Sequence, residues 1–328
     1  MRVYGWNAGT GGCGWYRVRE PLRGMSLLNI DTAWGAALDE EIVSSYDTIL
    51  VHILWQEAES EAWEILAREG AHKLVFDIDD DVWQYDSSTE NAKHYTPERL
   101  ARVERNIRIS SLVTTPSETL AQRIYERGLH DKIWILPNYV PESVLSLPRQ
   151  LPDSFTVGYQ GAPQHKIDLE LINEELYKFL VKSQDAKLRF YGPGEIKAPG
   201  WPTDRLEFFP WESDVMRYYS SLAMHVGIAP LTRIPFNDAK SAIRAVEYSA
   251  LGIPAIYSNR DPYRSWVIDG VNGFIVPDDE PREWSRRLSR FYRMPGLVKK
   301  MSDKARDMAK EWTTEKNAGG FVRAYESV

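Results

Sequence analysis

Short apolar runs alternate with amphipathic segments along the first half of the chain. The apolar runs predict strands at 2–6, 48–54, 73–78, 111–116 and 132–136. Between them, apolar residues recur with helical spacing and predict helices near 14–28, 57–69, 97–109 and 117–128. Alternation of strands with helices is typical of a parallel sheet whose two faces are covered by helices.

A second series of the same kind follows. Its predicted strands are 155–161, 188–192, 206–210, 224–230, 253–258 and 273–277, and its predicted helices lie near 166–182, 212–222, 239–251, 281–292 and 296–311. Two series in 328 residues suit two domains of roughly 150 residues each. We therefore predict an α/β protein of two doubly wound, Rossmann-like domains that face each other across a cleft at their strand ends.

The domain boundary is predicted where the periodicity is weakest. Residues 136–154 contain four prolines and no regular apolar spacing. The predicted organisation is a first domain over 1–140, a linker over 141–154 and a second domain over 155–312. Residues 313–328 form a last helix that we expect to pack back on the first domain.

Composition narrows the class of protein. The chain is 43% hydrophobic and 27% charged, with a mean hydropathy of -0.43, as in globular proteins. No apolar run approaches the 18 residues of a membrane span and the first residues lack a signal-peptide core, so we expect a cytoplasmic protein. The one cysteine, Cys13, excludes an intramolecular disulfide and a cysteine-based zinc site.

A glycine-rich turn follows the first predicted strand. Gly11, Gly12 and Gly14 let the backbone approach a ligand closely, and the start of the following helix favours anions. Arg17 lies on that helix, so the turn predicts a diphosphate contact. The alternative is a tight strand-to-helix connection without a ligand.

The stretch "KLVFDIDDDVWQYD" ends a predicted strand in four carboxylates, Asp77, Asp79, Asp80 and Asp81. Three interpretations stay open. The group holds a divalent ion; it binds acceptor hydroxyls or supplies a base, with Trp83 as a stacking surface; or it only ends a strand and caps the next turn. Because adjacent carboxylates repel each other, one of them is expected to have a raised pKa.

The most informative stretch of the second domain is the helix predicted over 239–251, with Asn237 or Asp238 as its cap. Lys240, Arg244 and Glu247 fall at i, i+4 and i+7, on one stripe of that helix. Cations near a helix N-terminus form a diphosphate site, and a carboxylate further along accepts hydrogen bonds from a ribose diol. The alternative is a surface helix with ion pairs along it.

Here the sequence resembles a known family. Lys240, Ser241, Arg244 and Glu247, together with the stretch 250–254 and "DGVNGFIVPDDEPREW" at 269–284, resemble the donor-binding domain of GT-B-fold glycosyltransferases. The chain is most similar to the large retaining family of group 1 type, which includes bacterial mannosyl- and glucosyltransferases and short members encoded by phages. The resemblance covers nearly the whole chain.

The resemblance implies a donor site in the second domain. There Glu247 binds the ribose of the nucleotide, and the residues around the diphosphate and donor are Lys240, Ser241, Arg244, Gly161, His165 and Lys166. Ala239 stands where the family often has a further glutamate. No metal ion or other cofactor is needed, because helix N-termini and Lys or Arg neutralise the leaving diphosphate.

The implied reaction moves a sugar from a nucleoside-diphosphate sugar, a UDP-sugar in the first instance, to a hydroxyl group with retention. Inversion instead needs a base, for which Asp79, Asp80 or His52 is available. Asp77, Asp81 and Trp83 are then the acceptor-binding candidates. The alternatives are a non-catalytic nucleotide-sugar binding protein and a sugar-nucleotide epimerase on the same scaffold.

The acceptor that the resemblance implies is a hydroxymethylated DNA base or, alternatively, a protein, a glycan or a small molecule. A stripe at every third residue of the helix predicted over 97–109 is consistent with a phosphate backbone; it comprises Arg99, Arg102, Arg105 and Arg108. Residues 1–150 nevertheless carry 15 Lys and Arg against 23 Asp and Glu, a net charge of -8, which argues against a polyanion. The base and sugar of the donor and the oligomeric state stay open.

Overall fold

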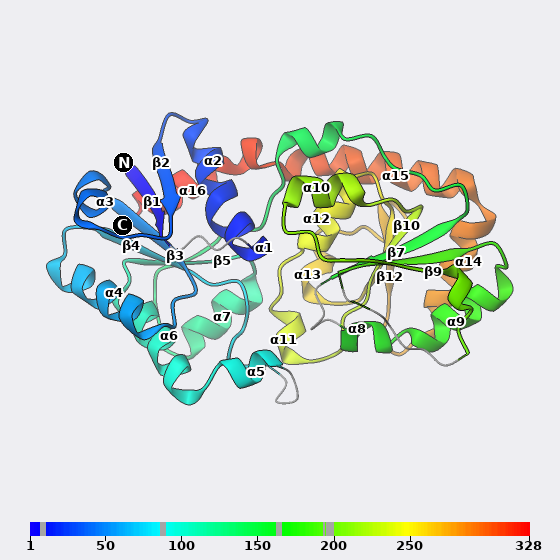
Figure 1. The fold of residues 1–328 in the computed structure, drawn as a ribbon, viewed down its shortest axis with the longest axis horizontal. Coiled ribbons are helices and arrows are strands. Elements are labelled where there is room, and N and C mark those ends of the chain that lie inside the picture. The colour runs from blue at the N-terminus through cyan, green and yellow to red at the C-terminus, as the bar shows by residue number, and fades with distance from the viewer. Residues whose placement is uncertain (7–10, 86–89, 162–165, 193, 195–199) are drawn as a thin grey trace. The chain divides into compact units, whose positions relative to one another are not determined.

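The structure is a computed structural model that describes residues 1–6, 11–85, 90–161, 166–192, 194 and 200–328. The chain forms two units (Figure 1). Unit 1 consists of residues 1–141, 239–241 and 312–328, and unit 2 of residues 142–238 and 242–311. The chain therefore passes between the units more than once.

Unit 1 is built on a six-stranded parallel sheet. Its strands are β1 (Arg2–Trp6), β2 (Asp31–Gly35), β3 (Thr48–His52), β4 (Lys73–Asp77), β5 (Leu112–Thr115) and β6 (Ile133–Ile135). Their order is β2-β1-β3-β4-β5-β6, and every neighbouring pair is parallel. The order reverses between β1 and β3, which is the switch point where ligands of such sheets bind.

The helices of unit 1 cover both faces of this sheet. They are α1 (Gly12–Gly14), a π-helical turn (Trp15–Arg19), α2 (Glu20–Ser26), α3 (Glu40–Ser45), α4 (Glu57–Glu69), α5 (Glu90–His94), α6 (Pro97–Ile109), α7 (Glu118–Glu126) and α16 (Thr314–Glu326). Alternate residues of a strand point to opposite faces. Ile49 and Val51 of β3 accordingly pack with α4 and α6, whereas Leu50 packs with α2 and α16.

The last helix, α16, is part of unit 1 and lies beside α2 (Figure 1). Arg23 of α2 pairs with Glu315 of α16 at 2.7 Å. A Cβ atom at Gly24 would come within 2.6 Å of the Thr314 side chain, so glycine is what allows this close approach.

Three elements of unit 1 escaped the sequence pattern, and these are β2, α3 and the five-residue α5. The edge strand β2 is the short sequence DTAWG, whose residues are exposed or half-buried, so it lacks the apolar run that marks the inner strands. Helix α3 is also short and contains no buried residue. Elements that bury little of their surface leave little periodicity in the sequence.

Unit 2 repeats the architecture. Its strands are β7 (Thr156–Gln160), β8 (Lys187–Tyr191), β9 (Leu206–Phe209), β10 (Val226–Ala229), β11 (Ala255–Ser258) and β12 (Gly273–Val276). The order is β12-β11-β10-β7-β8-β9, again with every pair parallel, and it reverses between β7 and β10. The α/β class predicted from the alternation of elements is thus confirmed.

The helices of unit 2 differ from the prediction at two places. They are the 3-10 turns Glu142–Ser146 and Thr203–Arg205, with α8 (Lys166–Glu170), α9 (Asn173–Lys182), α10 (Val215–Ser221), α11 (Pro235–Asp238), α12 (Ile243–Ala250), α13 (Asp261–Arg264), α14 (Arg282–Arg293) and α15 (Pro295–Ala309); a third 3-10 turn, Lys310–Trp312, precedes α16. The continuous helix predicted over 239–251 was wrong, because residues 239–242 are not helical and α12 begins at Ile243. The helix predicted near 166–182 is likewise divided, since α8 ends at Glu170 and α9 begins at Asn173.

Residues 239–241 leave the helix because unit 1 holds them. The Ser117 hydroxyl donates to the Ala239 carbonyl at 2.6 Å, and the Asn138 amide donates to the Ser241 hydroxyl at 3.1 Å. Lys240 lies between these two anchor points, in backbone without helical hydrogen bonds. Lys240 is therefore not on one helical stripe with Arg244 and Glu247.

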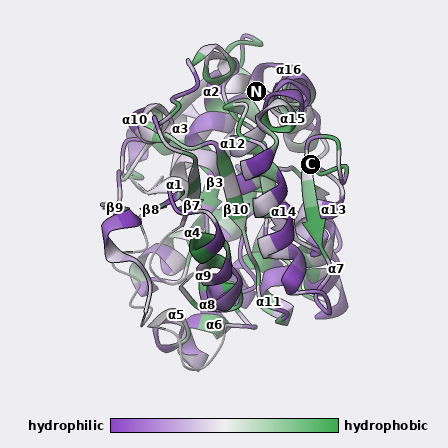
Figure 2. Cartoon of the chain, turned by 90° about the vertical axis from the view of Figure 1, so that its right-hand side faces the viewer, coloured by the Kyte–Doolittle hydropathy of each residue, from purple (hydrophilic) through white to green (hydrophobic). Residues whose placement is uncertain are grey.

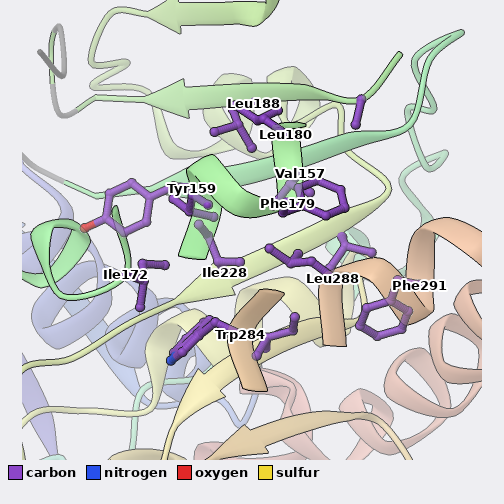
Figure 3. Packing of buried hydrophobic residues seen from close by; sticks show 14 of the residues in the cluster. Val157, Tyr159, Ile172, Phe179, Leu180, Leu188, Ile228, Trp284, Leu288 and Phe291 are labelled. Atoms are coloured by element: carbon purple, nitrogen blue, oxygen red, sulfur yellow. The ribbon is translucent and has the colours of Figure 1, made fainter. Parts of the chain in front are cut away.

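Helix α14 shows why the core of unit 2 forms. Its outward residues are charged, and hydrophilic colour dominates its ribbon in Figure 2. Trp284, Leu288 and Phe291 recur at helical spacing and are buried with Phe179 and Leu180 of α9 against the sheet (Figure 3). Burial of each such side chain contributes about 1.5–3 kcal/mol.

The opposite face of the same sheet is packed by α12. Val226 and Ile228 face the α9 side, so Gly227 between them faces Tyr248 of α12. A Cβ atom there would lie 2.7 Å from the Tyr248 ring, in a position where the ring is fully buried. Glycine at 227 is thus a requirement of packing.

Replacing Gly227 by alanine is expected to destabilise the protein by about 1–3 kcal/mol, the usual cost of overpacking a close-packed core. Urea unfolding measures this free energy. Gly296→Ala is the matched control, because a Cβ atom at Gly296 meets nothing within 4 Å and the residue lies in α15. The control should leave stability unchanged or slightly raised. Equal effects of the two changes would contradict the packing argument.

Candidate functional site

The four aspartates at the carboxyl end of β4 contact four different side chains. Asp77 binds Arg17, Asp79 binds His52, Asp80 accepts from Tyr85, and Asp81 binds Arg123. Within the described part of the chain, no three His, Cys, Asp or Glu residues are grouped as metal ligands. Each of the four aspartates thus has its own side-chain partner.

Arg17 and Asp77 form a buried ion pair inside unit 1. The Arg17 Nε and Nη2 atoms donate to the two Asp77 oxygens at 2.9 and 2.6 Å, and Nη1 donates to the Leu136 carbonyl and the Asn138 side chain, each at 2.7 Å. The Thr114 hydroxyl also donates to Asp77, at 2.5 Å. The two side chains are 0% and 2% exposed.

This pair corrects two predicted roles. Arg17 was expected at a diphosphate and Asp77 at an acceptor, but each is enclosed and hydrogen-bonded to the other. A buried charge is tolerated only when it is paired and hydrogen-bonded in this way. Their role is structural: they tie the start of the glycine-rich turn's helix to the carboxyl end of β4.

Asp81 and Trp83 are also bound within unit 1. Asp81 is 1% exposed and accepts from Arg123 at 2.6 Å. The Trp83 indole N–H donates to Glu104 at 3.0 Å, and the Arg127 guanidinium lies over its ring at 4.8 Å. Asp81, predicted to bind an acceptor, is instead bound to Arg123 inside unit 1. The Arg127 guanidinium covers one face of the Trp83 ring.

His52 and Asp79 form a dyad at the carboxyl ends of β3 and β4. The His52 Nε2 and Asp79 Oδ1 atoms are 2.8 Å apart, and the side chains are 13% and 12% exposed. Burial lowers the pKa of His52, but the Asp79 and Asp77 carboxylates outweigh it and raise that pKa above the ordinary value. Burial alone would raise the pKa of Asp79. The charges of His52 and Arg17 outweigh burial and hold that pKa well below its usual range.

Cys13, Asp80 and Lys240 complete this cluster. The Asp79 and Asp80 carboxylates raise the pKa of the Cys13 thiol, which hydrogen-bonds to Asp79. Burial raises the pKa of Asp80 and the adjacent Asp79 adds to this, against the opposing charge of Lys240. The cluster thus contains an ionised carboxylate, a protonatable imidazole and a carboxyl group of raised pKa within one unit, which is a set suited to proton transfer.

The dyad predicts a pH dependence of stability. A raised His52 pKa stabilises the fold below pH 6.5, and this contribution is lost as the pH rises through the folded pKa. A lowered Asp79 pKa stabilises it above pH 3.8, and this is lost as the pH falls through the folded pKa. We expect the free energy of unfolding to fall between pH 6.5 and 8.5, and less so in His52→Gln.

Urea unfolding at pH 5.5, 6.5, 7.5 and 8.5 measures this difference. His72→Gln is the control, because the His72 ring contacts the Val43 carbonyl at 2.8 Å and no carboxylate within the described residues. The control should keep the wild-type slope. A His52→Gln profile parallel to the wild type would contradict the assigned charge of the dyad.

The arginine stripe of α6 is occupied by internal partners. Arg102 pairs with Glu57 at 3.1 Å, Arg105 with Glu64 at 2.5 Å, and Arg108 with Glu104 at 3.3 Å. The fourth, Arg99, lies over the Trp55 ring at 4.3 Å. The stripe is largely compensated and therefore presents little free positive charge to a phosphate backbone.

The candidate donor residues of unit 2 lie around the end of β7. Arg244 of α12 is 9% exposed, packs over the Tyr159 ring at 5.1 Å and donates to the Tyr159 hydroxyl at 3.4 Å. Burial raises the pKa of Tyr159 to about 12, so the phenol is neutral. Gly161 leaves room for the guanidinium, because a Cβ atom there would be 2.8 Å from Arg244 Nη2.

One donor of Arg244 is unused. Its Nη1 atom is buried and has no hydrogen-bond partner among the described residues. An unpaired, buried guanidinium nitrogen costs free energy unless an anion or acceptor binds it. Arg244 thus has the charge and the free donor that a phosphate oxygen requires.

Glu247 lies one turn further along α12. It is 5% exposed and accepts from the Gln160 amide at 2.7 Å. Gln160 is the last residue of β7. Its side-chain amide oxygen, Oε1, is buried and has no hydrogen-bond partner among the described residues. Glu247 also contributes to the raised pKa of Tyr218, whose main cause is burial. Glu247 and Gln160 thus present hydrogen-bonding atoms at a strand end.

Sequence reasoning missed Gln160 and Asp168. Asp168 is 1% exposed and accepts from the Thr232 backbone and hydroxyl at 2.9 and 2.6 Å and from the Asn237 amide at 2.9 Å. It thus orders the loop between β10 and α11. The position of Gln160 at a strand end was a usable signal, whereas nothing local marks Asp168.

The other predicted donor and loop residues are placed as follows. His165 lies outside the described residues, and Lys166 begins α8, where its side chain is not described. Lys240 and Ser241 belong to unit 1, as shown above. Gly11 precedes α1, with Gly12 and Gly14 within it, and a Cβ atom at Gly11 or Gly12 would meet nothing within 4 Å.

Comparison with known proteins connects unit 2 to a family. Residues 202–308, about a third of the chain, match the family of glycosyl transferases group 1. The chain is 32% identical over 88 residues to a D-inositol 3-phosphate glycosyltransferase of Streptosporangium roseum, a match over 25% of this chain and 20% of that protein. A similar protein of Salinispora arenicola is 26% identical over 133 residues, 40% of this chain and 28% of the relative. The matches thus span less than a third of these curated relatives.

Solved structures share the whole fold. Sucrose-phosphate synthase from Thermosynechococcus elongatus aligns over 100% of this chain and 99% of its own, with a TM-score of 0.71 and 15% identity. The Anabaena protein HepE, in complex with UDP and glucose, aligns over 100% of both chains with a TM-score of 0.69 and 12% identity. The predicted GT-B fold is therefore confirmed, as is the resemblance to group 1 glycosyltransferases over residues 202–308.

None of the described helices combines the length and the apolar composition needed to cross a bilayer.

Proposed function

We propose that this protein is a glycosyltransferase that transfers a sugar from a UDP-sugar to a hydroxyl group. The observation that carries the proposal is the buried Arg244, whose Nη1 atom lacks a partner among the described residues, beside Gly161 at the end of β7. The matched family segment contains both Arg244 and Glu247. UDP is bound in the Anabaena structure of the same fold.

In this proposal unit 2 binds the donor. Arg244 binds the diphosphate, assisted by His165 and Lys166 of the same part of the chain, and Gly161 keeps the approach open. Glu247, oriented by Gln160, accepts hydrogen bonds from the ribose diol. Since cationic side chains neutralise the leaving diphosphate, we propose that the reaction needs no metal ion.

Unit 1 supplies the acceptor side of the reaction in this proposal. The His52–Asp79 dyad and the Asp80 carboxyl group offer a proton acceptor and a hydrogen-bond donor to the acceptor hydroxyl. We propose retention, with the donor phosphate assisting the acceptor proton and the dyad orienting the hydroxyl. Because the arginines of α6 are paired, we favour a glycan, protein or small-molecule acceptor over DNA.

A nucleotide panel tests the proposal directly. Thermal unfolding is measured with UDP, GDP, ADP and CDP, each with and without EDTA. A nucleotide at about 100 times its dissociation constant stabilises a protein by roughly 2.7 kcal/mol, a shift of a few degrees at this size. We expect UDP to raise the melting temperature equally with and without EDTA. Absence of a shift with all four nucleotides would reject a donor site.

Turnover separates transfer from the other activities of such a scaffold. Incubation of UDP-sugars with hydroxyl acceptors should release UDP together with a glycoside, whose anomeric configuration is read by NMR. Binding without UDP release would instead indicate a nucleotide-sugar binding protein, and sugar interconversion without UDP release an epimerase. A product of inverted anomeric configuration would indicate that the His52–Asp79 dyad acts as the catalytic base.

A further inference from the structure

Unit 2 has a strongly basic face formed by helices that follow the candidate donor residues in the sequence. The two helices α14 and α15, with Lys310, span residues 282–310 and carry ten Lys and Arg against three Asp and Glu, a net charge of +7. The whole chain has a net charge of -7, so this face is opposite in sign to the rest of the molecule. Such an asymmetry favours binding of an anionic partner.

Much of this charge is not neutralised internally. Six of the ten cations have no ion-pair partner within the described residues, and these are Arg282, Arg290, Arg293, Lys300, Lys304 and Arg306. Five of them are exposed, and Arg306 is half-buried. Among the described residues, Arg293 donates only to the Ser289 carbonyl, at 3.1 Å. The face therefore has cationic donors that are available to a ligand.

Part of the face is hollowed. A cavity of about 360 Å³ lies where the end of α9 packs beside α14, and its lining includes the cations Lys182, Arg286 and Arg293 and the hydroxyl residues Ser183, Ser289 and Tyr292. A cavity of that size takes a small molecule rather than a bare ion. Its lining includes no carboxylate among the described residues.

Most of the neighbouring groups that would repel an anion have hydrogen-bond partners in the protein. The carbonyls at the end of α9 belong to Leu180, Ser183 and Gln184, and all three accept from Arg205 Nη1 at 2.9–3.1 Å. Nearby, Asp185 accepts a hydrogen bond from the Tyr292 hydroxyl. Arg205 thus offsets the negative end of the helix, and the three cations of the cavity outnumber the one nearby Asp185 carboxylate.

Glu175 and Glu283 are similarly engaged. Glu175 accepts from Lys178 at 2.7 Å and from the Ser285 hydroxyl, and Glu283 pairs with Arg286 and Arg287 at 2.7 and 3.1 Å. Each of these carboxylates thus has a cation beside it. Lys182 and Arg293 are left as the two cations of the cavity without a carboxylate partner among the described residues.

We propose that this cavity binds a phosphate ester, held by Lys182, Arg286 and Arg293. Phosphate suits the site because it offers several acceptor oxygens to guanidinium and ammonium donors, and the remaining volume accommodates its organic group. The ester comes either from a soluble phosphorylated small molecule or from a phospholipid headgroup. The exposed Met294, 48% exposed beside Arg293, is the apolar contact that the second source would use.

The experiment uses defined probes with the full chain. Glycerol 3-phosphate and inorganic phosphate are titrated in solution by calorimetry, and vesicles of phosphatidylcholine with and without 30% phosphatidylglycerol are tested by co-sedimentation. The test variant carries Lys182→Glu and Arg293→Glu. The control carries Lys300→Glu and Lys304→Glu, which make the same charge change on the same face outside the cavity.

We expect the dissociation constant of glycerol 3-phosphate to rise at least tenfold in the test variant and less than twofold in the control. Binding in solution alone would identify a soluble ester as the ligand, and additional retention by phosphatidylglycerol vesicles a headgroup. Circular dichroism and urea unfolding of both variants establish that they are folded and that any loss of binding is not a loss of structure.

Three results would overturn the proposal. These are absence of binding to every probe, equal loss in the test and control variants, and binding of an oligonucleotide in place of the phosphate esters. Equal loss would show a diffuse electrostatic effect of the face. Oligonucleotide binding alone would show a nucleic-acid surface. Each outcome is independent of whether the donor proposal holds, because none of the readouts requires sugar transfer.

Discussion

Asp77→Ala is expected to lower the free energy of unfolding by about 3–5 kcal/mol, the usual loss when one partner of a buried ion pair is removed. The Arg17 guanidinium would remain enclosed at 0% side-chain exposure with its carboxylate missing. Among the described residues, it would retain only the Leu136 carbonyl and the Asn138 side chain as acceptors. Urea unfolding followed by tryptophan fluorescence measures the change.

The matched control is Asp47→Ala. Asp47 pairs with Arg2 at 2.7 Å, nearly the same distance as the 2.6 Å of Arg17 and Asp77, but its side chain is 48% exposed. Exposed pairs at this distance often contribute nothing measurable, so stability should hardly change. Similar losses in the two variants would show that the Arg17–Asp77 pair is not the anchor described above.

A double replacement separates charge from shape. Removing both charges with Arg17→Met and Asp77→Leu should recover much of the stability lost in Asp77→Ala, because no unpaired charge is then buried. If the double variant is as unstable as the single one, the hydrogen bonds to Leu136, Asn138 and Thr114 matter more than the ion pair itself.

Arg244→Leu is expected to weaken UDP binding about 10- to 100-fold, and this result rests on the proposed function. A hydrogen bond to a charged group contributes about 1.5–3 kcal/mol, and each 1.4 kcal/mol is a factor of ten in affinity. Leucine keeps an apolar contact with Tyr159 but removes the unpartnered Nη1 donor. Isothermal titration calorimetry measures the dissociation constant.

Arg264→Leu serves as the control for this change. Arg264 is exposed on α13 of the same unit, and its guanidinium bonds to Asp261 and Asn259. Loss of this charge should leave the UDP dissociation constant within a factor of two. An Arg244→Leu protein that is folded and binds UDP as tightly as the wild type would remove Arg244 from the donor site.

The fold was largely readable from local pattern. Inner strands such as β3 and β10 are continuous apolar runs because both faces of a parallel sheet are buried. Helices α4 and α6 begin and end where predicted, since their apolar spacing and flanking signals agree. Gly70, at a positive φ of 66°, ends α4 as a left-handed cap residue.

The glutamate helix shows where local pattern fails. Lys240, Arg244 and Glu247 have helical spacing, but hydrogen bonds from Ser117 and Asn138 of unit 1 hold residues 239–241 outside α12. A spacing argument contains no information about a partner more than a hundred residues away. The same limit explains why Asp168, which organises the loop containing Thr232, carried no signal in the sequence.

By itself, the sequence determined the alternation of strands and helices, the two α/β units and the resemblance of the segment around Glu247 to a nucleotide-sugar site, because periodicity and short motifs are local properties. Only the tertiary structure decided which charged groups are buried and which partners they have. It enclosed Arg17 with Asp77, paired the α6 arginines and left Arg244 with an unused donor. The physical reason is that the free energy of a charge depends on its burial and its partners, and both are set by residues distant in the chain.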